Sequence, residues 1–146
     1  MNMNGFKKKR RKRSPKQIQK DKTWAACSKY VRIRDANMQG YEECYTCGKF
    51  GYWKEMQAGH AFGGRGGSVL FDTDIIKPQC YACNCINHGK YDIFIPKLER
   101  ERGSKFIQEK SREQSQDKEY SLEELKAKEE DFKLRTVQLK NYDLII

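Results

Sequence analysis

Two Cys-x-x-Cys pairs, Cys44/Cys47 and Cys80/Cys83, are the residues whose types and spacing most directly indicate chemistry in this sequence. Four thiolates in two close pairs match the ligand set of a tetrahedral structural zinc site, and a tight turn lets each pair contact one ion. Gly48, directly after Cys47, suits a turn that needs a positive φ. Disulfides or a redox-active pair are the alternative, but no secretory signal precedes the cysteines and no βαβ pattern surrounds them. The sequence therefore predicts one structural Zn²⁺.

The two histidines, His60 and His88, both lie beside this cysteine framework. Residues 55–62 are expected to form a strand with His60 at its exposed end, followed by a glycine-rich loop and a returning strand at 69–76. The second cysteine pair then leads into a short helix that holds Asn84. The order strand–loop–strand–helix is typical of a ββα-metal, or HNH-type, nuclease. In such an arrangement zinc would hold the hairpin and helix together, and a second divalent ion would bind between them.

Phosphodiester hydrolysis explains why these residue types matter. Imidazole ionises near neutral pH and can take a proton from water, which makes His60 a candidate catalytic base. A hard cation, Mg²⁺ or Mn²⁺, would stabilise charge on the phosphate and on the leaving oxygen. Oxygen ligands suit that cation, so its candidate ligands are the amide of Asn84 and the carboxylates of Asp72 or Asp74. Asp74 is alternatively expected to orient the His60 ring, and Arg65 to contact a phosphate.

Length and composition predict one small core with tails, because the chain has 146 residues of which 37% are hydrophobic. The expected regions are a basic arm at 1–20, a zinc-stabilised core with flanking helices at 21–105 and a C-terminal helical extension at 106–146. A helix is expected from Asp21 to about Gln39, with Cys27 buried and inert on its apolar stripe. The sequence Ser121-Leu122-Glu123-Glu124 predicts a capping box that begins a last helix reaching about Lys140. The predicted fold class is α+β.

An aromatic-rich hairpin is expected around the first cysteine pair, in residues 41–54. Its aromatic residues are Tyr45, Phe50, Tyr52 and Trp53. We expect them to cover the zinc, since buried aromatic side chains dominate small cores; stacking on nucleic-acid bases is the alternative.

The net charge of +10 is unevenly distributed, because residues 1–22 contain ten Lys and Arg residues against Asp21 alone. Like charges at this density cannot pack, so Met1 to about Lys20 is expected to be a disordered arm. The arm is interpreted as a phosphate-binding segment held by counterion release, with a targeting signal or a solubilising tail as the alternatives. The candidate DNA-binding residues are Lys7, Lys8, Lys9, Arg10, Arg11, Lys12 and Arg13, together with Arg65.

A series of motifs follows in order along the chain: Cys44-Tyr45-Thr46-Cys47-Gly48, Gln57-Ala58-Gly59-His60, Phe71-Asp72 and Gln79-Cys80-Tyr81-Ala82-Cys83-Asn84. With the preceding segment 28–36, this series resembles the NinG/Rap family of phage recombination proteins over roughly residues 21–105. The resemblance implies a structure-specific endonuclease that cuts branched recombination intermediates such as Holliday junctions and D-loops.

The same resemblance implies that His60 is the general base and Asn84 a ligand of the catalytic ion. Two positions depart from the HNH pattern: Gly59 stands where many of these nucleases have Asp, and Asp74 stands near the place of the central Asn. Asp72, Asp74 and His88 are the candidates to replace the missing ligands of the catalytic ion.

Two other functions remain as alternatives. A non-catalytic zinc module would bind DNA or bridge recombination proteins, and an RNA-binding factor would rest on charge and aromatic residues. The expected partners are branched DNA, a second copy of the chain for symmetrical cutting, and other phage recombination proteins. No apolar run reaches the length of a membrane span. The resemblance to phage proteins implies that the chain acts in the cytoplasm of the bacterial host, at the nucleoid through DNA.

Overall fold

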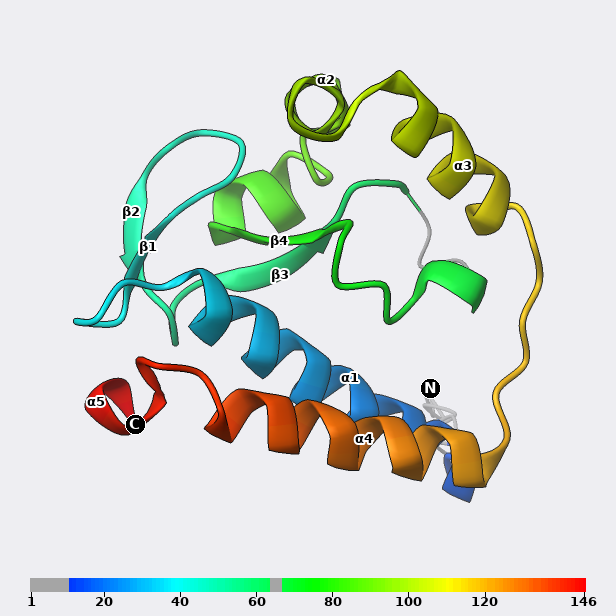
Figure 1. Cartoon of the computed structure of the whole chain (residues 1–146). Helices are drawn as coiled ribbons and strands as arrows, with labels where there is room; N and C mark the ends of the chain where they lie inside the picture. Colours follow the sequence, from blue (N-terminus) through cyan, green and yellow to red (C-terminus); the bar gives the residue numbers. More distant parts are fainter. Residues whose placement is uncertain (1–10, 64–66) are drawn as a thin grey trace, which may run out of the picture.

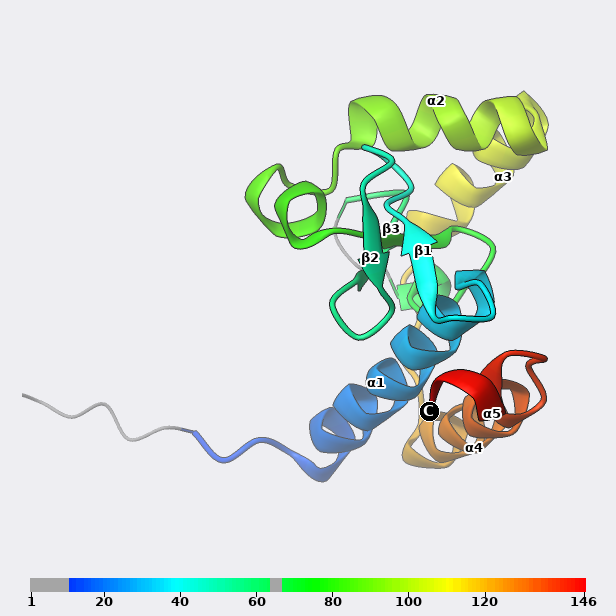
Figure 2. The ribbon, with the colours of Figure 1, turned by 90° about the vertical axis from the view of Figure 1, so that its left-hand side faces the viewer.

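The computed structural model describes residues 11–63 and 67–146, and two short antiparallel hairpins lie between two groups of helices (Figures 1 and 2). One group holds α1 (Pro15–Asp35), α4 (Leu122–Val137) and α5 (Tyr142–Ile145); the other holds α2 (Tyr91–Arg102) and α3 (Ser104–Gln114). The hairpins are β1 (Tyr41–Glu43) with β2 (Phe50–Tyr52), and β3 (Gln57–His60) with β4 (Ile76–Gln79). The short helical segments are η1 (Gly67–Val69) and η2 (Ala82–Ile86). The predicted α+β class is therefore confirmed.

Helix α1 begins at Pro15, so the expected start at Asp21 and the arm boundary at Lys20 were wrong. The Ser14 hydroxyl accepts a hydrogen bond from the backbone N–H of Gln17 at 3.1 Å, and proline suits the first helical position. The side chain of Gln19 is buried and donates a hydrogen bond to Glu129 of α4. These contacts bring the basic residues of 15–20 into the folded domain, whereas residues 1–10 lie outside the described part.

The C-terminal end of α1 also differs from the expectation, since the helix ends at Asp35 rather than near Gln39. Ala36 is extended, and the side-chain oxygen of Asn37 accepts hydrogen bonds from the backbone N–H groups of Gln39 and Tyr41. When an Asn side chain accepts hydrogen bonds from backbone N–H groups a few residues later, the chain forms a turn and the helix ends. Met38, which lies within the range of the expected helix, is consequently in a turn and exposed.

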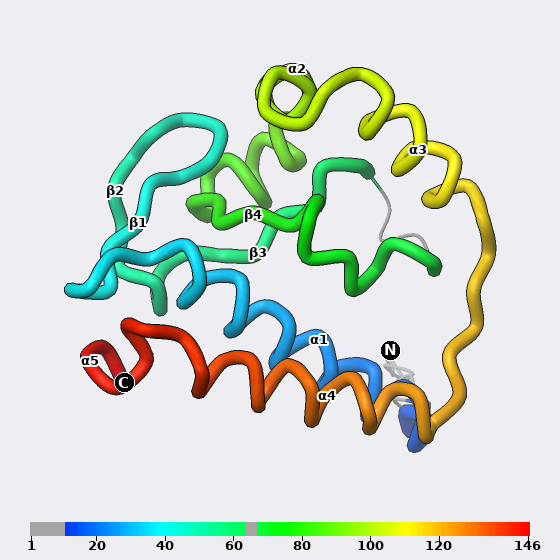
Figure 3. Tube along the Cα trace, viewed as in Figure 1, coloured from blue at the N-terminus to red at the C-terminus, as the bar shows by residue number. Residues whose placement is uncertain are grey.

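Helices α1 and α4 lie side by side and run in the same direction, with the connection 115–121 passing along the edge of the molecule (Figure 3). Leu125 and Phe132 of α4 share a core with Cys27 and Tyr30 of α1, and Ile76 of β4 completes it. At the far end, Ile145 of α5 packs on Trp53 next to the first hairpin. Helices α4 and α5 therefore contribute to the core of the molecule.

The predicted capping box at the start of α4 is confirmed. The Ser121 hydroxyl accepts from the N–H of Glu124, whose carboxylate accepts from the N–H of Ser121.

The returning strand is shifted along the chain: β4 comprises Ile76–Gln79, whereas we expected residues 69–76. Val69 ends η1, and residues 70–75 form turns, where a side-chain oxygen of Asp72 accepts the backbone N–H of Asp74. Pro78 lies inside β4, opposite Ala58. Proline is tolerated there because the sheet has only two strands, so the missing N–H breaks no hydrogen bond to a third strand. The carbonyl of Pro78 accepts the N–H of Tyr45 at 2.9 Å, which joins the two hairpins.

In the described ranges, no helix has the length and apolar character needed to cross a membrane.

Candidate metal centre and catalytic residues

The four predicted cysteine ligands converge at one point of the fold. Cys44 and Cys47 come from the turn between β1 and β2, and Cys80 and Cys83 come from the junction of β4 and η2; all four sulfur atoms lie within 4.8 Å of one another. The sulfurs of Cys47 and Cys80 are 3.8 Å apart. Tetrahedral coordination with Zn–S bonds of about 2.3 Å separates neighbouring sulfurs by about 3.8 Å. The arrangement therefore fits a structural metal ion such as zinc.

Backbone geometry explains how the first pair is presented. Gly48 has φ +74°, a conformation that side chains disfavour, and its N–H donates to the carbonyl of Cys44. On the second pair, the N–H of Asn84 donates to the carbonyl of Cys80. Each Cys-x-x-Cys segment is thus closed into a tight turn, as the spacing predicted.

The thiols of the cluster differ in how readily they ionise. Burial favours the neutral thiol of Cys44, but hydrogen bonds from Thr46 and from neighbouring backbone N–H groups outweigh it and lower its pKa to about 6. Burial raises the pKa of Cys83 to about 12. A divalent cation at the centre of the cluster would deprotonate the second thiol as well, because coordination stabilises thiolate.

The expectation that aromatic side chains cover this cluster was largely wrong. Met56 is the hydrophobic side chain packed with the buried cysteines. Tyr45 packs on Phe94 of α2 at 4.7 Å between ring centroids, and Trp53 packs on Ile33 and Ile145. These longer-range partners come from helices whose positions the local pattern does not reveal.

His60 is the last residue of β3, as predicted, but it is buried, with 8% of its surface exposed, and not at an exposed strand end. Its ring stacks on that of Trp24 in α1, with 4.9 Å between centroids and 19° between planes. Nε2 lies 2.9 Å from the carbonyl oxygen of Leu70. Because a carbonyl only accepts, Nε2 carries the proton in this contact, and Nδ1 is the nitrogen with basic character.

Asn84 lies on the opposite face of β3 from His60. Successive side chains of a strand point to alternate faces, so Ala58 and His60 face α1 while Gln57 and Gly59 face η2. The Asn84 amide donates to the side-chain oxygen of Gln57 at 2.8 Å. The strand therefore separates the candidate base from the candidate metal ligand.

The remaining predicted ligands point elsewhere. A carboxylate oxygen of Asp72 is 2.7 Å from the ammonium of Lys110 in α3, and Asp74 faces Arg102 of α2 at 3.7 Å. His88 is exposed just after η2. In the part of the chain that the structure describes, the cysteines form the one group of three or more Cys, His, Asp or Glu side chains close enough to share an ion. The structure thus does not gather His60, Asp72, Asp74 and His88 into a second cluster.

Two buried polar residues were missed by the sequence reasoning. Gln79, on β4 just before Cys80, donates from Nε2 to the Thr46 hydroxyl and to the Gly89 carbonyl, yet its Oε1 has no hydrogen-bond partner in the described residues. A buried acceptor left in that state costs about 1–3 kcal/mol. Glu42 likewise has two unpartnered oxygens, and burial raises its pKa to about 8. The position of Gln79 directly before a metal-binding pair was the available signal.

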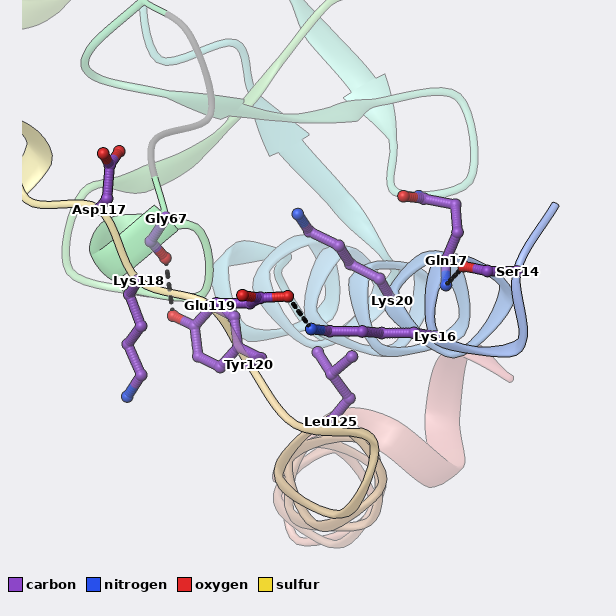
Figure 4. Close-up of a pocket in the computed structure, with 10 residues that line it drawn as sticks. All are labelled: Ser14, Lys16, Gln17, Lys20, Gly67, Asp117, Lys118, Glu119, Tyr120 and Leu125. Atoms are coloured by element: carbon purple, nitrogen blue, oxygen red, sulfur yellow. Dashed lines mark hydrogen bonds and ion pairs between the residues drawn. The ribbon is translucent and has the colours of Figure 1, made fainter.

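The basic residues are only partly covered by the structure. Residues 7–10 and Arg65 lie outside the described residues, whereas Arg11, Lys12 and Arg13 are exposed. Figure 4 shows a pocket between the start of α1 and the connection that precedes α4, with Lys16, Lys20 and Lys118 among its lining residues. Lys16 is already paired with Glu119. Because Asp117 and Glu119 also line this pocket, the positive charge of its lysines is largely balanced.

Comparison with known proteins gives one family. The sequence model of a family described as Bacteriophage Lambda NinG protein matches residues 2–142. No curated protein matches the chain, and no solved structure does. The family match extends from the N-terminal basic residues past the end of α4.

Proposed function

Because this chain belongs to the NinG family of bacteriophage proteins, we propose that it acts in phage recombination as a metal-dependent endonuclease of branched DNA, such as Holliday junctions and D-loops. The observation that carries the proposal is the connection of β3 and β4: β3 ends in His60, and β4 leads through the second cysteine pair directly into Asn84. An imidazole and an amide oxygen flanking one strand, beside a metal-stabilised turn, are the parts that hydrolysis of a phosphodiester requires.

Zinc bound by the four cysteines would have a structural role. It would connect the β1–β2 turn to the β4–η2 junction, and so fix Asn84 against β3. A four-cysteine site leaves no open position for substrate, which assigns the hydrolytic chemistry to other residues.

His60 would take a proton from the attacking water at Nδ1. The Leu70 carbonyl holds the proton on Nε2, and the Trp24 ring fixes the plane of the imidazole. This replaces the carboxylate partner expected at Asp74, because the Asp74 side chain is turned toward Arg102.

A divalent cation would stabilise charge on the phosphate and on the leaving oxygen. Asn84 is the predicted ligand whose position suits this ion best, since its amide nitrogen is held by Gln57 and its oxygen is directed at Gly59. The exposed Arg11, Lys12 and Arg13, with the half-buried Lys16 and Lys20, would contact the DNA backbone by charge. Symmetrical cutting of a junction calls for two copies of the chain, and the substrate places the protein at host DNA in the cytoplasm.

The test is cleavage of a labelled four-way junction beside a linear duplex of the same sequence, with Mg²⁺, with Mn²⁺ or with neither. Wild type is expected to cut near the branch point in the presence of either ion. His60→Ala should abolish cutting but keep junction binding and zinc content, whereas His88→Ala, which changes the exposed histidine, should cut normally. Cutting by His60→Ala at the wild-type rate would remove His60 from the reaction.

A non-catalytic zinc module that binds junctions is the second candidate. It is favoured by Gly59, which supplies no carboxylate before His60, and by the burial of His60. Junction binding without cutting under all metal conditions would select it.

A further inference from the structure

The amide of Gln79 is fixed in one orientation by its surroundings. Gln79 is 0% exposed, and its Nε2 donates to the Gly89 carbonyl at 2.9 Å and to the Thr46 hydroxyl at 3.0 Å. Turning the amide over would place Oε1 against the carbonyl oxygen of Gly89, where two acceptors repel. Oε1 therefore points away from these groups, and it has no hydrogen-bond partner in the described residues.

The amide of Asn84 is oriented in the same way. Its Nδ2 donates to Oε1 of Gln57 at 2.8 Å, and the same oxygen accepts from the thiol of Cys85 at 3.0 Å. The nitrogen of Asn84 thus faces Gln57, and its Oδ1 faces the opposite way, toward Gly59.

Both oxygens converge on the space beside Gly59. A Cβ atom added at Gly59 would lie 1.9 Å from Oε1 of Gln79 and 3.1 Å from Oδ1 of Asn84. The side chain of Gln79 in β4 therefore fills the place where a residue-59 side chain would begin. Two amide oxygens beside the same glycine, one of them buried and without a partner among the described residues, form a site for a group that attracts hydrogen-bond acceptors.

We propose that Gln79 Oε1 and Asn84 Oδ1 together bind a hard divalent cation beside Gly59. Such cations select oxygen ligands, and Mg²⁺ commonly takes few of them from protein and the rest from water and substrate phosphates. Gln79 then supplies, from the neighbouring strand, the oxygen that a carboxylate at position 59 would otherwise give. The role of this ion in cleavage rests on the proposed function; its binding does not.

Two neutral ligands make binding weak in the free protein and stronger when phosphate oxygens join them. Asn84→Asp adds a negative charge at nearly unchanged shape, so it should tighten binding. Gln79→Met and Asn84→Ala each remove one oxygen, and Gly59→Ala displaces Gln79 Oε1. Asn87→Ala is the matched control, because this exposed amide follows η2 and takes no part in the site.

The experiment titrates zinc-loaded, full-length protein with Mn²⁺ and follows the free Mn²⁺ signal by electron paramagnetic resonance. Mn²⁺ is suited because it competes poorly with Zn²⁺ for thiolates. We expect one Mn²⁺ per chain in wild type and in Asn87→Ala, about tenfold tighter binding in Asn84→Asp, and at least about tenfold weaker binding in Asn84→Ala, Gln79→Met and Gly59→Ala. Zinc content and melting temperature, measured for every variant, show which of them are folded.

Wild type that binds no Mn²⁺ beyond its zinc would overturn the proposal, and so would unchanged affinity in folded Asn84→Ala. If Gln79→Met loses zinc, its Mn²⁺ affinity is not interpretable, and Asn84→Ala and Asn84→Asp test the cation site instead. If wild type cleaves the junction but its Mn²⁺ affinity does not depend on Asn84, the cation site is refuted and the proposed nuclease activity is supported. Stoichiometric Mn²⁺ binding that depends on Asn84, without cleavage, would support the site and refute the nuclease.

Discussion

The ring of His60 lies nearly parallel to that of Trp24, at 4.9 Å between centroids and 19° between planes. The contact joins the end of β3 to α1, so the orientation of the candidate base depends on a helix that begins near the N-terminus of the described chain. Stacked aromatic rings gain about 0.5–1.5 kcal/mol beyond their burial, enough to favour one ring orientation. Trp24 is thus a positioning residue in the proposed reaction.

Replacing Trp24 by Ala should lower the single-turnover rate of junction cleavage by about 10-fold to 100-fold. Without the stacked ring the His60 imidazole is no longer held in one orientation, and misplacement of a catalytic group slows the reaction by this order. Trp24→Phe keeps a ring for stacking and should recover most of the rate. Junction affinity and zinc content should be unchanged in both variants. A loss of rate that Trp24→Phe does not restore, or one that appears only as weaker binding, would contradict the positioning role.

The metal-binding turns could be predicted because their determinants are local. Two ligands on one tight turn and Gly48 at positive φ are visible in a few consecutive residues. The same holds for the capping box at Ser121 and for the position of His60 at a strand end.

The failures concern contacts between distant segments and local caps or turns that composition and apolar pattern did not indicate. The dense charge of residues 7–13 predicted a disordered arm, although Ser14 and Pro15 begin α1 directly after it. The hydrogen bond of Gln19 to Glu129 joins residues that are 110 positions apart, so no local pattern could predict it. His60 is buried because Trp24 covers it, a contact that no local pattern contains. The apolar residues of 69–76 suggested a strand, but the Asp72 side chain makes a turn within them.

Cys80→Ser should remove zinc and abolish the cooperative unfolding transition, because the free energy of binding structural zinc is also free energy of folding. The matched control is Cys85→Ser, since Cys85 is exposed and stands outside the four-cysteine group. Zinc content by mass spectrometry and thermal unfolding by circular dichroism test both variants. A zinc-free Cys80→Ser protein that unfolds like wild type would show that the cluster has no structural role.

Deleting residues 2–10 should weaken DNA binding and flatten its dependence on salt. The deletion removes four positive side chains, Lys7, Lys8, Lys9 and Arg10, so the slope of log K against log salt should fall by up to about 3 to 4. The melting temperature should not change, because the deletion ends before the cap at Ser14. An unchanged salt slope would show that these residues do not contact phosphates.

Deleting residues 2–20 serves as the contrast to the shorter truncation. It also removes the first turns of α1 and the bond of Gln19 to Glu129, so it should lower the melting temperature as well as DNA affinity.

Cys27 should be unreactive in the folded protein. Burial raises the pKa of its thiol to about 12, and its surface is inaccessible beneath α4. The native state therefore keeps the proton while the unfolded state loses it near pH 9, so this residue's stabilising contribution is complete below pH 9 and declines as pH rises toward 12. The decline is at most about 1.4 kcal/mol per pH unit. The melting temperature of wild type should thus fall more steeply between pH 9 and 11 than that of Cys27→Ala.

The burial of Cys27 should also protect it from chemical modification. A thiol reagent at pH 8 should label Cys85 and leave Cys27 intact. Labelling of Cys27 in folded protein, or parallel pH profiles for the two proteins, would contradict its burial.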